Sequence, residues 1–182
     1  MKTDTPELLF ATRGDFRAWL RKNAETHDGV WLVFGKTKAV ATLSANDALE
    51  EALCFGWIDG QMKSVDADRY LKYFAKRRAK SVWSIKNKKT VEMLRAKKWM
   101  TPLGEKAVET AKQNGMWDAR TEDADKALVD ALAEKLSAFP SAHEHFMKLP
   151  PSAKLANTRR WLSVKNEAAR QKTFEKIVEQ LQ

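Results

Sequence analysis

The pattern of apolar positions in the first 75 residues predicts strands and helices in alternation. Thr12-x-x-Asp15 and Ser44-x-x-Asp47 match the capping box with which many helices begin, and apolar residues at helical spacing follow each. Short apolar runs rich in β-branched and aromatic residues separate the two helices and indicate strands. The predicted order is strand 7–11, a helix after Thr12, strand 30–34, a helix after Ser44 that ends at Gly56, and strands 57–62 and 69–75.

The rest of the chain has helical spacing alone. An acidic turn at 65–68 joins the last two strands and predicts an antiparallel hairpin. Beyond Lys76, Ser84 and Thr101-Pro102 supply helix starts, and an apolar stripe at 174–181 marks the last helix. The sequence therefore predicts an α+β fold, with a small, mostly antiparallel sheet of about four strands packed with helices, followed by a C-terminal helical cluster.

Length and composition favour a folded protein without a membrane span. The 182 residues fit one domain with a helical extension, so we expect an α+β domain at 1–116 and a helical region at 117–182, packed as one globule. No apolar run approaches the roughly 20 residues that cross a bilayer, and the N-terminus lacks the order of a secretory signal. Because Cys54 is the only cysteine, no internal disulfide forms, and we expect a soluble protein of the cytoplasm. Nothing in the sequence indicates an oligomeric state.

The net charge of +9 is concentrated in one segment. Residues 62–100 hold thirteen Lys and Arg against three acids, a local balance of +10, so the remainder sums to about −1. Such a concentration suggests an anionic partner, which could be a nucleic acid, a phosphorylated small molecule or an acidic protein. The alternative is a well-solvated surface, since lysine is readily exposed.

Two stretches carry a family resemblance. The first is EEALCFGWIDGQ at 50–61, followed by Arg69-Tyr70 and by Arg77-Arg78-x-x-Ser81-x-Trp83-Ser84-x-x-Asn87. The second runs from LPPS at 149–152 through RRWL at 159–162 to the last helix. Together they resemble the bacterial YdeI/OmpD-associated family, also labelled bacteriocin-protection proteins, over nearly the whole chain from Phe10 onward. The resemblance implies an association with stress and antimicrobial-peptide resistance, and it brings no catalytic residues with it.

The segment at 57–61 predicts the floor of a pocket. On a strand, Trp57, Asp59 and Gln61 project to one face, and an aromatic ring, a carboxylate and an amide together suit ligand binding better than a core. In an enzyme, Asp59 would be the candidate general acid or base. The alternative is that Asp59 pairs with an arginine such as Arg69 or Arg77 and fixes the hairpin.

The segment at 77–87 predicts an anion site opposite that floor. Arginine offers planar donors that match phosphate or carboxylate, and the helix that starts at Ser84 has free backbone N–H groups in its first turn. The alternative is that the serines only cap this helix. The leading hypothesis is thus a cleft that binds a small anionic ligand through Trp57, Asp59, Gln61, Arg69, Arg77, Arg78, Ser81, Trp83, Ser84 and Asn87.

A nucleic-acid-binding module is a second hypothesis. Basic and aromatic residues alternate between 69 and 99, and such a mixture can stack bases and hold the phosphates of a single strand. No recognised nucleic-acid motif is present. Strand alternation sends Tyr70 and Phe74 to one face and Tyr73 to the other, so at least one aromatic set is expected in the core.

Other catalytic and metal-binding patterns are weak. Cys54 lies near a helix C-terminus without a nearby histidine, and we expect a buried structural thiol. His143 and His145 point roughly 200° apart on a helix, which does not suit a metal. No phosphate-binding glycine loop or dinucleotide fingerprint occurs, so no cofactor is predicted.

Overall fold

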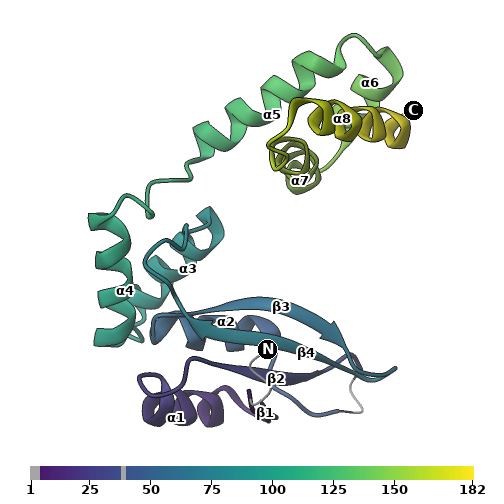
Figure 1. Ribbon diagram of the computed structural model, residues 1–182. Coiled ribbons are helices and arrows are strands. Elements are labelled where there is room, and N and C mark those ends of the chain that lie inside the picture. Colours follow the sequence, from purple (N-terminus) through teal and green to yellow (C-terminus); the bar gives the residue numbers. More distant parts are fainter. Residues whose placement is uncertain (1–4, 38–39) are drawn as a thin grey trace. The chain divides into compact units, whose positions relative to one another are not determined.

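The computed structural model describes residues 5–37 and 40–182, which form two compact units that divide between Arg120 and Thr121 (Figure 1). All four strands belong to the first unit, and the second unit is entirely helical. The predicted α+β class is therefore confirmed, with strands in the N-terminal part and helices alone in the C-terminal part.

The first unit is built on a mixed four-stranded sheet with the order β1-β2-β4-β3. Strand β1 (Glu7–Leu8) runs parallel to β2 (Gly29–Gly35), whereas β2 and β3 (Trp57–Ser64) both pair antiparallel with β4 (Arg69–Lys76). The acidic turn between β3 and β4 closes the predicted hairpin. The sheet is mostly antiparallel, as the sequence predicts.

Strand β3 contains a bulge that the sequence pattern did not predict. Asp59 lies opposite Phe74 and Met62 lies opposite Lys72, so three steps along β3 match two steps along β4. The extra residue breaks the two-residue alternation on which the sequence placed Gln61 on the face of Trp57 and Asp59. Trp57 is fully buried, while Gln61 is exposed.

The core lies on one face of the sheet. Helix α1 (Arg13–Asn23) begins with the predicted capping box of Thr12 and Asp15, and Ser44 caps helix α2 (Ala45–Cys54). The helices pack their apolar sides on alternate strand residues, a cluster that includes Phe16, Leu20, Val30, Leu32, Phe34, Leu53 and Phe74. Tyr70 packs against this core, whereas Tyr73 pairs with Trp31, whose ring centroid is 5.1 Å away. The predicted separation of these aromatic residues is confirmed.

Two further helices complete the first unit. Ser84 caps α3 (Ile85–Ala96), and Thr101 caps α4 (Pro102–Gln113). The carbonyl oxygen of Cys54 at the end of α2 accepts hydrogen bonds from the backbone N (3.1 Å) and the Oγ1 (2.6 Å) of Thr101. Gly56, with φ of 73°, ends α2 in the left-handed conformation that its position in the sequence predicts. The start of α4 is thereby fixed against the end of α2.

The second unit has its own core. It consists of α5 (Glu122–Leu136), α6 (Pro140–Lys148), α7 (Pro151–Leu162) and α8 (Glu167–Leu181), which bury Leu132, Leu136, Ala142, Phe146, Phe174 and Val178. An ion pair of 2.8 Å between Arg159 and Asp125 links α7 to α5. Within the described residues of the whole chain, no helix combines the length and apolar character needed to cross a membrane.

Candidate functional site

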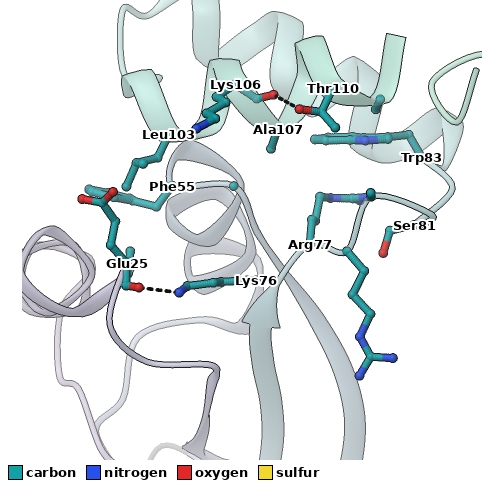
Figure 2. Close-up of a pocket in the computed structure, with 15 residues that line it drawn as sticks. Glu25, Phe55, Lys76, Arg77, Ser81, Trp83, Leu103, Lys106, Ala107 and Thr110 are labelled. Atoms are coloured by element: carbon teal, nitrogen blue, oxygen red, sulfur yellow. Dashed lines mark hydrogen bonds between the residues drawn. The ribbon is translucent and has the colours of Figure 1, made fainter. Parts of the chain in front are cut away.

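A pocket of about 340 Å³ opens in the first unit between the end of β4 and helix α4 (Figure 2). The residues after β4 form one wall, and α4 forms another through Leu103, Lys106 and Ala107. Most of the lining surface is apolar. Three of the cationic groups, Lys76, Arg77 and Arg78, lie at the end of β4, and Lys106 lies on α4. The lining residues are Ala24, Glu25, Phe55, Gly56, Lys76, Arg77, Arg78, Ala79, Ser81, Trp83, Leu103, Lys106, Ala107, Thr110 and Ala111.

Arg77 is the central charged group of this pocket. Figure 2 shows its guanidinium beneath the Trp83 ring, whose centroid lies 3.6 Å from the guanidinium carbon. Its Nε and Nη1 atoms are buried, and neither has a hydrogen-bond partner among the described residues. Burial lowers the pKa of the Arg77 guanidinium to about 10, against the weaker opposing effect of Asp59, so the group is still cationic at neutral pH. The pocket wall therefore contains a partly buried positive charge without a bonded counter-ion among the described residues.

The surrounding backbone fixes Arg77 and Trp83 in place. The N–H of Arg77 donates to the carbonyl of Gly56 at 2.9 Å, which ties the end of β4 to the residue after α2. Trp83 is 1% exposed, donates its backbone N–H to Met116, and packs its ring 5.1 Å from that of Trp117. Because the ring is held by the core, the arginine that lies against it has a defined position.

The pocket rim carries both signs of charge. The Lys76 ammonium donates to the backbone carbonyl of Glu25 at 2.5 Å, whereas Arg78 and Lys106 are exposed. Glu25 is the acidic residue of the lining. Charges at such an exposed rim are screened by water and salt, and they contribute less than a buried charge such as Arg77.

Four of the ten ligand-binding residues predicted from the sequence line this pocket. They are Arg77, Arg78, Ser81 and Trp83, which lie close together in the sequence as well. The pocket brings them together with α4 and Phe55, and not with the predicted strand face of Trp57, Asp59 and Gln61.

Trp57 and Asp59 of that strand face bond to other groups, and Gln61 is exposed. The indole N–H of Trp57 donates to the carbonyl of Ala24 at 3.1 Å from inside the core. Asp59 forms an ion pair with Lys72 across the hairpin, so its partner is a lysine and not Arg69 or Arg77 as the alternative reading expected. Asp59 does not line the pocket, and a catalytic role for it has no support from this geometry.

The remaining three predicted residues stabilise turns and caps. Arg69 forms an ion pair of 2.7 Å with Asp66 in the hairpin turn. The Ser84 hydroxyl accepts a hydrogen bond from the backbone N–H of Asn87 at 3.2 Å, as an N-terminal cap does. The Ser84 cap is the structural alternative that the sequence left open, whereas the pairing of Arg69 with Asp66 was not among the alternatives.

Sequence reasoning missed the apolar half of the pocket. Leu103, Ala107 and Ala111 recur every four residues and so mark one face of α4, but this spacing indicates only that the face is covered. Which element meets that face depends on the contact of Thr101 with Cys54, 47 residues away. No local signal in the sequence reports a contact of this range.

Many of the Lys and Arg side chains of the basic segment at 62–100 bond to other groups within the first unit. At least five of its thirteen Lys and Arg bond to carboxylates or backbone carbonyls, and Lys63 and Lys97 lie over the rings of Trp31 and Trp99. The charge of this segment therefore does not by itself define a nucleic-acid interface. The bonded residues are Arg69 with Asp66, Lys72 with Asp59, Lys76 with Glu25, Lys88 with Trp117 and Arg120, and Arg95 with Glu92 and Glu105.

Cys54 is a buried thiol at the end of α2. It is 0% exposed, and burial raises the pKa of its thiol to about 11, although the nearby Arg17 lowers it in part. A thiol protonated at neutral pH is a poor nucleophile. We therefore expect the native protein to resist iodoacetamide at pH 8 and to react only when unfolded.

The same thiol makes stability depend on pH. The pKa of the Cys54 thiol is about 9 in the unfolded chain and about 11 in the folded protein. Between these two values the thiol ionises only in the unfolded chain, so the free energy of unfolding falls as the pH rises from 9 to 11. We expect a loss of roughly 1 kcal/mol between pH 9 and 10, measured by urea unfolding. Cys54→Ala should lack this loss, and an equal loss in that variant would assign the effect to other groups.

Two family models match the chain, one on each side of the division between the units. Residues 8–107 match the model described as "Domain of unknown function (DUF8412)". Residues 127–182 match the model described as "Bacteriocin-protection, YdeI or OmpD-Associated", so the resemblance is confirmed for the C-terminal part and not from Phe10 onward. The motif at 50–61 lies within the first match. No curated protein and no solved structure matches the chain.

Proposed function

We propose that this chain, which belongs to the family described as "Domain of unknown function (DUF8412)", binds a small anionic ligand in the Arg77 pocket. The observation that carries the proposal is the partly buried guanidinium of Arg77, whose buried Nε and Nη1 have no partner among the described residues. Cations buried in proteins are normally paired, because an uncompensated charge costs several kcal/mol. Asp59 compensates the charge of Arg77 only in part, and an anion in the pocket would supply a hydrogen-bonded counter-charge.

The neighbours of Arg77 support this reading. Trp83 offsets part of the cost of burying the guanidinium, and Arg78 and Lys106 add positive potential at the entrance. The volume of about 340 Å³ lies at the lower end of the range for small-molecule sites, so the ligand is small. The description of the second family match suggests protection against bacteriocins as the setting in which such binding matters, and we place this setting in the cytoplasm as part of the proposal.

Replacing Arg77 by leucine should separate ligand binding from stability. The variant removes the buried charge and keeps an apolar side chain beside Trp83, so we expect binding of anions to fall at least tenfold. The free energy of unfolding should stay equal or rise by up to about 2 kcal/mol, because an uncompensated charge is lost. Binding is measured by isothermal titration with inorganic phosphate, acetate and hexanoate, and stability by urea unfolding.

Arg69→Leu is the matched control, because it removes one arginine from the same unit at the hairpin turn, outside the pocket. We expect it to leave anion binding unchanged. Equal weakening by both substitutions would mean that only net charge matters, and the proposal would then be wrong. A large loss of stability in Arg77→Leu would instead identify Arg77 as part of the scaffold.

A further inference from the structure

The lining of the pocket indicates the chemical class of the ligand as well as the sign of the ligand's charge. Its buried cation lies at one end, beside β4, while Phe55, Leu103 and Ala107 present apolar surface to the same space (Figure 2). Such a lining does not suit an inorganic ion, which would lose hydration along the apolar walls without compensation. The apolar walls require an apolar partner.

The buried part of the pocket offers one positive charge. The ammonium of Lys76 already bonds to the carbonyl of Glu25, and Arg78 and Lys106 are exposed. The Glu25 carboxylate at the rim opposes a second negative charge on the ligand. Among the cations that line the pocket, Arg77 is the one with buried N–H groups that have no partner among the described residues, and it balances one negative charge.

We infer that the ligand is an apolar-bodied monocarboxylate, with its carboxylate toward Arg77 and its apolar body between Phe55 and the Leu103–Ala107 face of α4. The inference rests on the proposed function and specifies its ligand class. A guanidinium presents planar donors that match a carboxylate, and it is less strongly hydrated than an ammonium, so it suits a partly buried ion pair. The pocket volume leaves room for a short aliphatic chain or one aromatic ring beside the carboxylate.

A homologous series of carboxylates tests this directly. Acetate, butyrate, hexanoate and benzoate are titrated into the full chain by calorimetry at constant ionic strength, with inorganic phosphate as the comparison. Each buried methylene should tighten binding about three- to fourfold, because it transfers apolar surface from water to the pocket wall. Hexanoate and benzoate should therefore bind more tightly than acetate and phosphate.

A space-filling variant locates the apolar body. Ala107 lies in the middle of α4 against Gly56, so Ala107→Leu places extra carbon atoms in the pocket without weakening the helix. We expect hexanoate to bind at least tenfold more weakly to this variant, while acetate changes less than threefold. Ala127→Leu, an exposed alanine inside α5, is the matched control and should bind hexanoate as the unmodified chain does.

The outcomes distinguish the two proposals. Equal binding of acetate and hexanoate, or tighter binding of phosphate, would overturn the monocarboxylate and leave anion binding at Arg77 in place. Hexanoate binding that survives Ala107→Leu would also overturn it. If no anion of the series binds and Arg77→Leu changes nothing, the proposed function itself is wrong.

Discussion

Replacing Glu51 by alanine is expected to lower the free energy of unfolding of the first unit by about 3 kcal/mol. Glu51 is 2% exposed and accepts hydrogen bonds from Arg13 Nε at 2.8 Å and Arg17 Nη1 at 2.6 Å. The substitution removes the shared partner of two partly buried guanidinium groups from α1. Arg17 also donates to the carbonyl of Trp99 at 2.7 Å, so the change loosens the contact of α1 with both α2 and the loop before α4.

Tryptophan fluorescence in urea measures this effect, because six of the seven tryptophans belong to the first unit and only Trp161 belongs to the second. Glu92→Ala is the control, since Glu92 pairs with Arg95 on the surface and has a side chain 60% exposed. We expect that control to cost less than 1 kcal/mol. If Glu51→Ala lowered the free energy of unfolding no more than Glu92→Ala does, the bonds of Glu51 to Arg13 and Arg17 would not be stabilising.

Replacing Gly104 by alanine is expected to destabilise the first unit by about 2 kcal/mol, although alanine is the better helix former. A Cβ atom on Gly104 would lie 2.3 Å from the carbonyl oxygen of Cys54 and 2.9 Å from that of Leu53. Both atoms are backbone at the end of α2, so they cannot move aside as a flexible side chain would. The start of α4 must retreat, and its hydrogen bonds from Thr101 to Cys54 lengthen.

Gly14→Ala serves as the control, because we expect it to stabilise the first unit and not to destabilise it. Gly14 lies in the first turn of α1, and its nearest neighbour in the direction of a Cβ is the Thr12 hydroxyl at an ordinary 3.6 Å. We expect this substitution to raise the free energy of unfolding by up to about 1 kcal/mol. Urea unfolding of both variants tests the pair, and a stable Gly104→Ala would show that α2 and α4 approach less closely than described.

The sequence predicted the elements well because their signals are local. Capping residues such as Thr12 and Ser44 and the C-terminal Gly56 lie within a few residues of the structure they determine. The hairpin could be predicted for the same reason. The bulge in β3 was not predicted, because the alternation of side chains assumes regular pairing. Gly60 lies where the pairing shifts, and glycine inside a strand often marks a bulge, but a single glycine does not specify one.

The residues of the candidate site likewise fall into those with a local signal in the sequence and those without one. Arg77, Arg78, Ser81 and Trp83 fall within seven residues of one another, so a reading of the sequence finds them together. The sequence predicts a pocket floor at Trp57 because an aromatic residue near a carboxylate is unusual in a core, yet the indole N–H of Trp57 donates to a carbonyl inside the core. The apolar wall from α4 depends on packing between distant segments, which a single sequence does not encode in a readable pattern.

The bulge between Asp59 and Met62 also bears on strand pairing between two molecules of this protein at high concentration. Strand β3 is an edge of the sheet and is eight residues long, so a regular ladder there would present backbone groups to the same edge of another molecule. The extra residue twists the edge and interrupts the spacing that such a ladder needs. The exposed Lys63 on the same strand adds like-charge repulsion between two such edges. We therefore expect the irregular strand to disfavour edge-to-edge pairing of this protein with another copy.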